Sequence, residues 1–221
     1  MKNSQVIVFD MDGVLMDVTD SYRETIVRTV HHFTGVSVTR ERIQEYKNQG
    51  GWNNDWALSQ RLAADLGVEV SYPEVSRHFI SIFLDEGLIH RERPIPGPGL
   101  LDRLGAKYEL AIFTGRSRRE ATISLSREGW LDRFHLVTSD DVRNEKPAPD
   151  GLLQIAATRP GKQLLYIGDT VDDARSGKAA GVPFVGIASS SSPMRGELVA
   201  ALRAEGAAAV LNDINELESL L

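Results

Sequence analysis

The sequence contains no cysteine among its 221 residues, so disulfide bonds, thiolate nucleophiles and cysteine-based zinc sites are excluded. It also has no excess of basic residues, because 25 lysines and arginines stand against 31 acidic residues, for a formal net charge of −6. General binders of nucleic acid or of anionic membranes need a basic surface, so we expect neither partner. No uninterrupted apolar stretch approaches the length of a membrane span.

The first apolar stretch of the chain is also unlike the core of a signal peptide, because Asp10, Asp12 and Asp17 interrupt or follow it closely. Together with the lack of cysteine, this favours a cytoplasmic protein. Hydrophobic residues make up 42% and charged residues 25%, as in globular proteins with a packed core. At 221 residues the chain can form one domain, or one domain that carries a sizeable insertion.

The apolar run Val6-Ile7-Val8-Phe9 predicts a strand that is buried on both faces of a parallel sheet. From Tyr108 onward, further strand patterns alternate with helical patterns that end on glycine. Such alternation predicts an α/β fold with a doubly wound parallel sheet. The later predicted strands cover residues 109–114, 134–138, 163–167, 183–187 and 208–211, and the two clearest helices cover 118–129 and 172–181.

Residues 17–92 break this alternation, because their apolar side chains recur at helical spacing. We therefore predict an inserted all-helical domain over 17–92 and an α/β core formed by 1–16 and 93–221. Ser21-x-x-Glu24 and Ser71-x-x-Glu74 both have the pattern of a capping box at a helix start. The apolar stripes, which we expect to form the core of a helix bundle, are Tyr22, Ile26, Val30 and Phe33; Leu58, Leu62 and Leu66; and Val75, Phe79, Ile82 and Phe83.

Polar residues follow the predicted strands at their carboxyl ends, where open α/β sheets bind ligands. Asp10 and Asp12 come directly after the first strand, and side chains two positions apart on an extended backbone point the same way. Two neighbouring carboxylates repel each other and favour a cation or a shared proton. The other polar groups after predicted strands are Thr114-Gly115, Lys146-Pro147 and the segment 168–173.

Together these residues resemble the haloacid dehalogenase-like hydrolase superfamily. Its D-x-D-G motif matches Asp10, Asp12 and Gly13, and its second motif, a threonine or serine after a strand, matches Thr114. The resemblance implies a Rossmann-like core, and the inserted helices resemble the cap of the phosphoglycolate phosphatase and β-phosphoglucomutase branch. The third motif, a lysine often followed by proline, matches Lys146-Pro147, and the fourth, G-D-x-x-x-D, matches Gly168, Asp169 and Asp173.

The resemblance implies a phosphatase that works through an aspartyl-phosphate. Asp10 is then the nucleophile that attacks phosphorus. Asp12 protonates the leaving oxygen and afterwards deprotonates the water that hydrolyses the intermediate. The Thr114 hydroxyl and backbone amides near Gly115 hold phosphoryl oxygens at a helix N-terminus, and Lys146 neutralises charge on the transferring group.

The resemblance also implies Mg²⁺ as cofactor, held directly by Asp10, Asp169 and the carbonyl of Asp12, with Asp173 as a ligand or as a residue that orients metal-bound water. Charge counting agrees with this, because four aspartates and a phosphate monoester together far outweigh the single positive charge of Lys146. A divalent cation nearly restores the balance.

Substrate specificity is expected to reside in the cap. One hypothesis is that Lys47, Asn48 or Trp52 contacts the leaving group; the alternative is a Gly-Gly turn followed by a helix cap, with Trp52 anchoring the loop. Arg116 follows the phosphate-binding loop and is interpreted either as a substrate contact or as part of a solvated helix start. Asp172 is interpreted as a solvent-facing acid at a helix start.

The sequence thus predicts a Mg²⁺-dependent phosphatase that acts on a small phosphorylated metabolite. A sugar phosphomutase is the alternative within the same superfamily. A haloacid dehalogenase fits less well, since those enzymes lack the second aspartate present here as Asp12. From a different class, a non-catalytic phosphorylation-responsive binding protein shares the acidic cluster, the threonine and the lysine, but no helical insertion is expected after its first strand. The apolar stripes are compatible with a monomer and with a homodimer.

Overall fold

The structure is a computed structural model that describes residues 5–221, so residues 1–4 of the predicted core segment 1–16 lie outside the described residues. Six strands form one parallel sheet in the order β5-β4-β1-β6-β7-β8. This confirms the predicted doubly wound α/β fold, and each predicted strand boundary lies within one residue of the observed one. The strands are β1 (Gln5–Phe9), β4 (Glu109–Phe113), β5 (His135–Val137), β6 (Gln163–Gly168), β7 (Phe184–Ile187) and β8 (Ala209–Leu211).

Helices cover both faces of the sheet, which is why the β1 sequence is apolar from Val6 to Phe9. Ile7 and Phe9 pack with the helices of one face, whereas Val6 and Val8 pack with those of the other, and all four side chains are fully buried. The first face carries α5 (Leu100–Lys107), α6 (Arg118–Arg127) and the short helix η5 (Ile214–Ser219); the second carries α7 (Asp150–Ala157), α8 (Val171–Ala180) and α9 (Arg195–Ala204).

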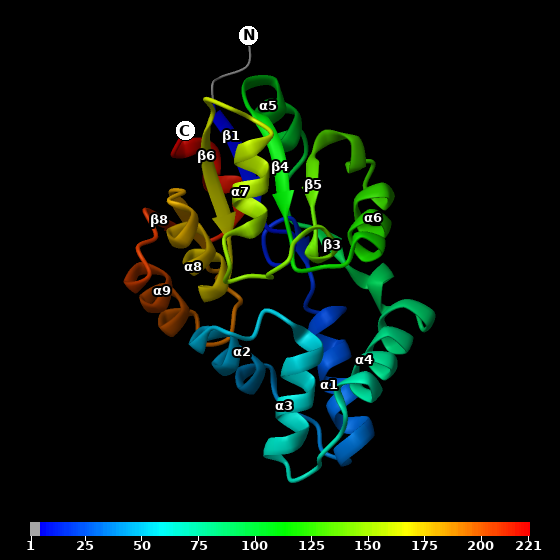
Figure 1. Ribbon diagram of the computed structural model, residues 1–221. Helices are drawn as coiled ribbons and strands as arrows, with labels where there is room; N and C mark the ends of the chain where they lie inside the picture. The colour runs from blue at the N-terminus through cyan, green and yellow to red at the C-terminus, as the bar shows by residue number, and fades with distance from the viewer. Residues whose placement is uncertain (1–4) are drawn as a thin grey trace.

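The inserted helices lie together beyond the carboxyl ends of the strands, toward which the strand arrows point in Figure 1. Two short antiparallel strands, β2 (Met16–Asp17) and β3 (Arg93–Pro94), connect them to the core. No helix within residues 5–221 is long and apolar enough to cross a membrane. The inserted elements are α1 (Tyr22–Thr34), α2 (Arg40–Gln49), α3 (Asp55–Asp65), α4 (Tyr72–Ile80), the π-helical turn η1 (Ser81–Asp85) and η2 (Leu88–Arg91).

Most of the predicted apolar stripes form the core of these helices; for example, the rings of Tyr22 and Phe83 lie 4.0 Å apart. Leu66 is an exception, because α3 ends at Asp65 and the leucine is 41% exposed. The predicted capping box at Ser71 is present, but the one at Ser21 is wrong. The Ser21 side chain is buried, makes no capping bond and donates instead to the carbonyl oxygen of Val18 at 3.4 Å.

A Gly-Gly turn after α2 rests on the start of α8 in the core. The Gly51 N–H donates to Asp172 Oδ1 at 2.7 Å, and a Cβ on Gly50 would lie 3.0 Å from Val171 Cγ1. The interpretation of Asp172 as a solvent-facing acid is therefore wrong, since its side chain is buried and holds the cap turn against the core.

Candidate active site

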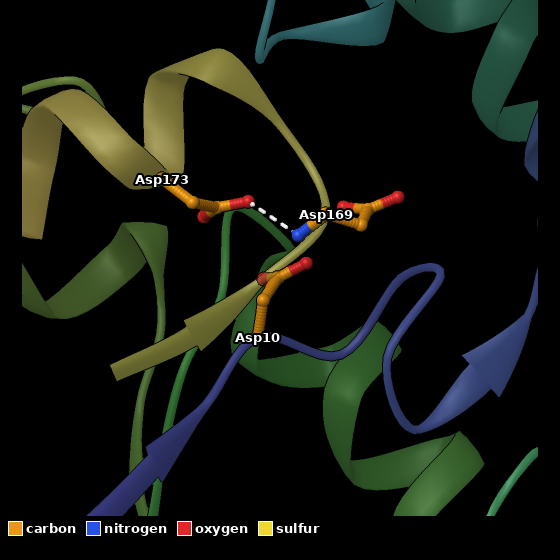
Figure 2. A group of neighbouring side chains, drawn as sticks. All are labelled: Asp10, Asp169 and Asp173. Atoms are coloured by element: carbon orange, nitrogen blue, oxygen red, sulfur yellow. Dashed lines mark hydrogen bonds between the residues drawn. The ribbon is translucent and has the colours of Figure 1, made fainter. Parts of the chain in front are cut away.

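Three aspartates from neighbouring elements meet at the carboxyl edge of the sheet. Asp10 follows β1, Asp169 follows β6, and Asp173 lies in the first turn of α8, as Figure 2 shows. One carboxylate oxygen of each lies within 4.8 Å of the others. The pairing of β1 with β6 brings Asp10 and Asp169 together, and the Asp10 N–H extends the ladder by donating to the Ile167 carbonyl at 2.8 Å.

The Lys146 ammonium lies between two of these carboxylates. Its Nζ is 2.6 Å from Asp10 Oδ1 and 2.7 Å from Asp173 Oδ1, and the side chain is only 1% exposed. Lys146 comes from the loop between β5 and α7, so three separate segments supply this buried ion cluster. Burial would lower the pKa of Lys146, but the two carboxylates raise it above its ordinary value and keep the lysine charged.

The carboxylate of Asp173 is fully engaged within the protein. Its Oδ1 accepts hydrogen bonds from Lys146 and, at 2.5 Å, from the Tyr166 hydroxyl. Its Oδ2 accepts from the backbone N–H of Asp169 at 3.2 Å (Figure 2) and from the N–H and hydroxyl of Thr170. A carboxylate has about four lone-pair sites, so these donors saturate it. Asp173 therefore fixes Lys146 and the backbone of Asp169, and its expected role as a metal ligand or as a residue that orients metal-bound water stays a prediction.

The ionised carboxylates of Asp10 and Asp169, by contrast, are poorly stabilised by their surroundings. Burial raises the pKa of Asp10 to about 7, against the lowering effect of Lys146. Burial and the nearby charges of Asp10 and Asp173 raise the pKa of Asp169 well above its ordinary value, and its Oδ1 is buried with no hydrogen-bond partner among the described residues. A buried carboxylate oxygen without a partner is costly. Two adjacent carboxylates of this kind fit a divalent cation that prefers oxygen ligands.

Gly13 allows Asp169 to occupy its position. The turn after β1 gives Gly13 a φ of 71°, and its N–H donates to the Met16 carbonyl at 2.8 Å. A Cβ at this position would overlap Asp169 Oδ2 and lie 2.6 Å from Asp169 Cγ. The glycine of the D-x-D-G pattern is therefore required both by backbone conformation and by the close approach of Asp169.

The second aspartate of that pattern has a different environment. The carboxylate of Asp12 is 28% exposed and faces the guanidinium of Arg116, whose Nε and Nη2 lie 2.8 and 2.5 Å from Asp12 Oδ1. Arg116 is itself buried, and its Nη2 lies 2.8 Å from Glu92 Oε1. The structure therefore joins Arg116 to protein carboxylates rather than leaving its guanidinium open to solvent.

The segment after β4 supplies the predicted phosphate-binding loop of the site. The Thr114 hydroxyl accepts the Arg116 N–H at 3.2 Å, and α6 begins just beyond, with Ser117 as its N-cap. Gly115 lines a cavity of about 210 Å³ whose wall also includes Asp10, Asp12 and Asp169. Unpaired amides near a helix start are suited to hold phosphoryl oxygens.

The cap lines one side of this cavity, but not with all the residues predicted to do so. Lys47 lines the cavity, yet its Nζ is already 2.5 Å from Asp55 Oδ1 and donates to the Trp52 carbonyl at 2.7 Å. Asn48 and Trp52 are not among the lining residues: Asn48 accepts a hydrogen bond from Gln44, and Trp52 packs edge-on against Tyr46.

Asn53 is a cavity residue that the sequence did not single out. Its Nδ2 is buried without a hydrogen-bond partner among the described residues, and it would lie 2.5 Å from a Cβ on Gly115. The cap amide thus lies directly against the predicted phosphate-binding loop, and the absence of a side chain at Gly115 makes room for it. Nothing in the sequence distinguishes Asn53 from its polar neighbours.

Comparison with known proteins agrees with this geometry. A phosphoglycolate phosphatase from Salmonella typhimurium is 26% identical over 208 residues, which cover 85% of this chain and 82% of that protein. A protein from Phytophthora nicotianae named imidazoleglycerol-phosphate dehydratase is 35% identical over 196 residues, covering 83% of this chain but only 43% of that protein.

Among solved structures, a conserved haloacid dehalogenase-like protein of Agrobacterium tumefaciens has the same fold, with a TM-score of 0.77 at 21% identity over 97% of this chain and 96% of that one. The family model described as haloacid dehalogenase-like hydrolase matches residues 7–187. That match spans both the sheet and the inserted helices. The chain therefore belongs to the haloacid dehalogenase-like hydrolase family and is an enzyme of its phosphatase-type branch.

Proposed function

We propose that the chain is a Mg²⁺-dependent phosphatase that hydrolyses a small phosphate monoester through an aspartyl-phosphate on Asp10. The observation that carries this proposal is the buried cluster in which Lys146 fixes Asp10 beside Asp169, whose Oδ1 has no partner. A nucleophilic carboxylate needs a defined orientation and a nearby positive charge, and this cluster offers both.

In the proposed reaction, a carboxylate oxygen of Asp10 attacks phosphorus and the bond from phosphorus to the leaving oxygen breaks. Lys146 neutralises charge that develops on the phosphoryl oxygens, while amides at Gly115 hold one of them. Asp12 gives its proton to the leaving alcohol. Water then attacks phosphorus of the acyl phosphate, gives a proton to Asp12, and orthophosphate leaves as Asp10 is restored.

Two observations support a fit to Mg²⁺. The buried Oδ1 of Asp169 lacks a hydrogen-bond partner among the described residues, and oxygens of Asp169 and Asp10 lie within 4.8 Å of each other. Those two carboxylates would hold the ion, with Asp173 fixing the Asp169 backbone. When bound, Mg²⁺ supplies charge neutralisation between the nucleophile and the phosphoryl group.

The charge of the cavity favours a leaving group that carries a basic nitrogen over one that carries a carboxylate. Every cationic side chain of the lining lies within 4 Å of a protein carboxylate, whereas Asp140 and Glu145 at the cavity wall have no ion-pair partner among the described residues. The cationic side chains are Arg23 and Lys47, both beside Asp55, and Arg116 beside Asp12.

An imidazole-bearing phosphate monoester combines such a nitrogen with a ring that can pack on the cavity aromatics Tyr22 and Trp56. The name of the Phytophthora relative refers to a compound of this kind, although its dehydratase activity belongs to a protein of which this chain spans less than half. We therefore place imidazole-bearing phosphate esters beside phosphoglycolate as the substrates to be compared first.

The test is phosphate release from a panel of esters, with and without Mg²⁺, by the native chain and by Asp10→Asn. The panel includes phosphoglycolate, a hexose phosphate, histidinol phosphate and phenylalaninol phosphate, whose neutral ring controls for charge. We expect Mg²⁺-dependent release that Asp10→Asn abolishes, and faster turnover of histidinol phosphate than of phenylalaninol phosphate. Undiminished release by Asp10→Asn contradicts the nucleophile, and isomerisation of the hexose phosphate without net release favours a phosphomutase.

A further inference from the structure

Arg116 sits at the centre of a buried polar network that the steps above do not use. Besides Asp12, its guanidinium bonds to Ser124 Oγ through Nη1 at 2.8 Å and to Glu92 through Nη1 and Nη2 at 3.2 and 2.8 Å. The side chains of Arg116 and Glu92 are 1% and 0% exposed. From the cap side, the ring of Tyr22 lies 4.8 Å from the guanidinium carbon.

This network fixes one oxygen of Asp12 and leaves the other available. Both contacts from Arg116 go to Oδ1, and no hydrogen bond reaches Oδ2 from any of the described residues. A proton on Asp12 is therefore best placed on Oδ2, on a carboxyl group that lines the cavity and is held in a single orientation by two donors.

Glu92 and Ser124 fix the guanidinium of Arg116 in the orientation that it presents to Asp12. Glu92 Oε1 lies 2.8 Å from Arg116 Nη2, and Ser124 Oγ donates to Glu92 Oε2 at 2.6 Å. Arg116, held in this way, presents two directional donors to Asp12 Oδ1.

The elements that supply the network span the junction between cap and core. Arg116 comes from the loop after β4, Ser124 from α6, Tyr22 from the first cap helix and Glu92 from the position just before β3, where the chain returns to the core. We propose that Arg116 is a positioning residue that directs the acid proton of Asp12 toward the leaving oxygen, and that Glu92 holds Arg116 in place. This inference rests on the proposed function.

The dependence of rate on the leaving group separates this role from a merely structural one. An alkyl ester such as glycerol 2-phosphate expels a strongly basic alkoxide that needs protonation, whereas p-nitrophenyl phosphate expels a weakly basic phenolate that does not. The ratio kcat/KM covers the steps through departure of the leaving group, so hydrolysis of the common acyl phosphate does not obscure the comparison.

The test compares both esters for the double variant Arg116→Met/Glu92→Gln, which removes both buried charges and so avoids leaving one unpaired. We expect kcat/KM for glycerol 2-phosphate to fall about 100-fold and that for p-nitrophenyl phosphate to fall less than about tenfold. Asp12→Asn should show the same selectivity, and adding the double variant to it should cause no further selective loss, because Arg116 acts through Asp12.

Arg127→Met is the matched control. Arg127 also clamps the returning segment, donating to the carbonyl oxygens of Ile89 at 2.9 Å and Glu92 at 3.3 Å, but it does not reach Asp12. Its loss should change kcat/KM for the two esters by the same factor. Equal losses on both esters in Arg116→Met/Glu92→Gln, or none, overturn this inference alone. Failure of the native chain to release phosphate from either ester overturns the proposed function as well.

Discussion

Substitution of Gly13 by alanine should damage the metal site through a displacement that can be estimated from the structure. The added Cβ would lie 2.6 Å from Asp169 Cγ. Carbon atoms in contact normally stay about 3.5 Å apart, so Asp169 must retreat by about 1 Å. Metal ligands tolerate only about 0.2 Å of error. We therefore expect Gly13→Ala to weaken Mg²⁺ binding by about 10–100-fold, as mutation of a residue that positions a metal ligand does.

Gly181→Ala provides the control, because it reproduces the backbone strain without the overlap. Gly181 has a φ of 67°, close to the 71° of Gly13, but no atom lies within 4 Å of a Cβ added there. Both variants should lose about 1–2 kcal/mol of stability from the left-handed conformation alone. In a chain of this size, about 1 kcal/mol of stability corresponds to roughly 2–4 °C in Tm. The backbone strain alone should therefore lower Tm by a similar amount in both variants.

The assay is calorimetric titration of each purified variant with Mg²⁺, together with the Mg²⁺ dependence of phosphate release. Gly181→Ala should bind the ion as the native chain does, and Gly13→Ala should not. Native Mg²⁺ affinity in Gly13→Ala would refute the reasoning, since it would mean that Asp169 can move by about 1 Å without consequence or that it is not a ligand.

Other predictions concern the ion cluster and the cap. The pKa of Asp10 in the folded protein, about 7, exceeds its ordinary value of 3.8, so the stability that protonated Asp10 contributes to the ion-free protein is lost as pH rises through about 7. Mg²⁺ should therefore raise Tm more at about pH 8 than at about pH 5. An equal rise in Tm at both pH values would contradict this. Tyr166→Phe removes the 2.5 Å bond to buried Asp173 and should cost about 2 kcal/mol in denaturant unfolding; a cost near zero would show that the hydroxyl is dispensable. Asn53→Ala, which deletes the unpaired amide against Gly115, should raise KM about tenfold for the best substrate in steady-state assays; an unchanged KM would remove Asn53 from the binding site.

The fold was accessible from sequence because its main determinants are local. The apolar run before Asp10 and the alternation after Tyr108 depend on neighbouring residues, and they yield the strands to within one residue. The positions of the polar groups were accessible for a related reason, since carboxyl ends of parallel strands share one edge. The convergence of Asp10, Lys146 and Asp169 follows from that rule without knowledge of any long-range contact.

The features that sequence reasoning missed depend on distant partners. The contacts of Arg116 with Asp12 and Glu92 join positions 104 and 24 residues apart, so no local pattern distinguishes it from an ordinary helix-start arginine. Asp172 meets Gly51 across 121 residues, which is why a buried anchor was interpreted as a surface acid. Local patterns also fail where burial changes a side chain's partners, as at Ser21.

The central claim, nucleophilic attack by Asp10, is tested most directly by trapping the intermediate. The native chain is mixed with Mg²⁺ and a radiolabelled phosphate ester, quenched in acid within one turnover and digested for peptide mapping. The label should appear on the peptide that contains Asp10, and Asp10→Asn should carry none. Label on a different residue, or turnover that persists undiminished in Asp10→Asn without any labelled peptide, would contradict the account.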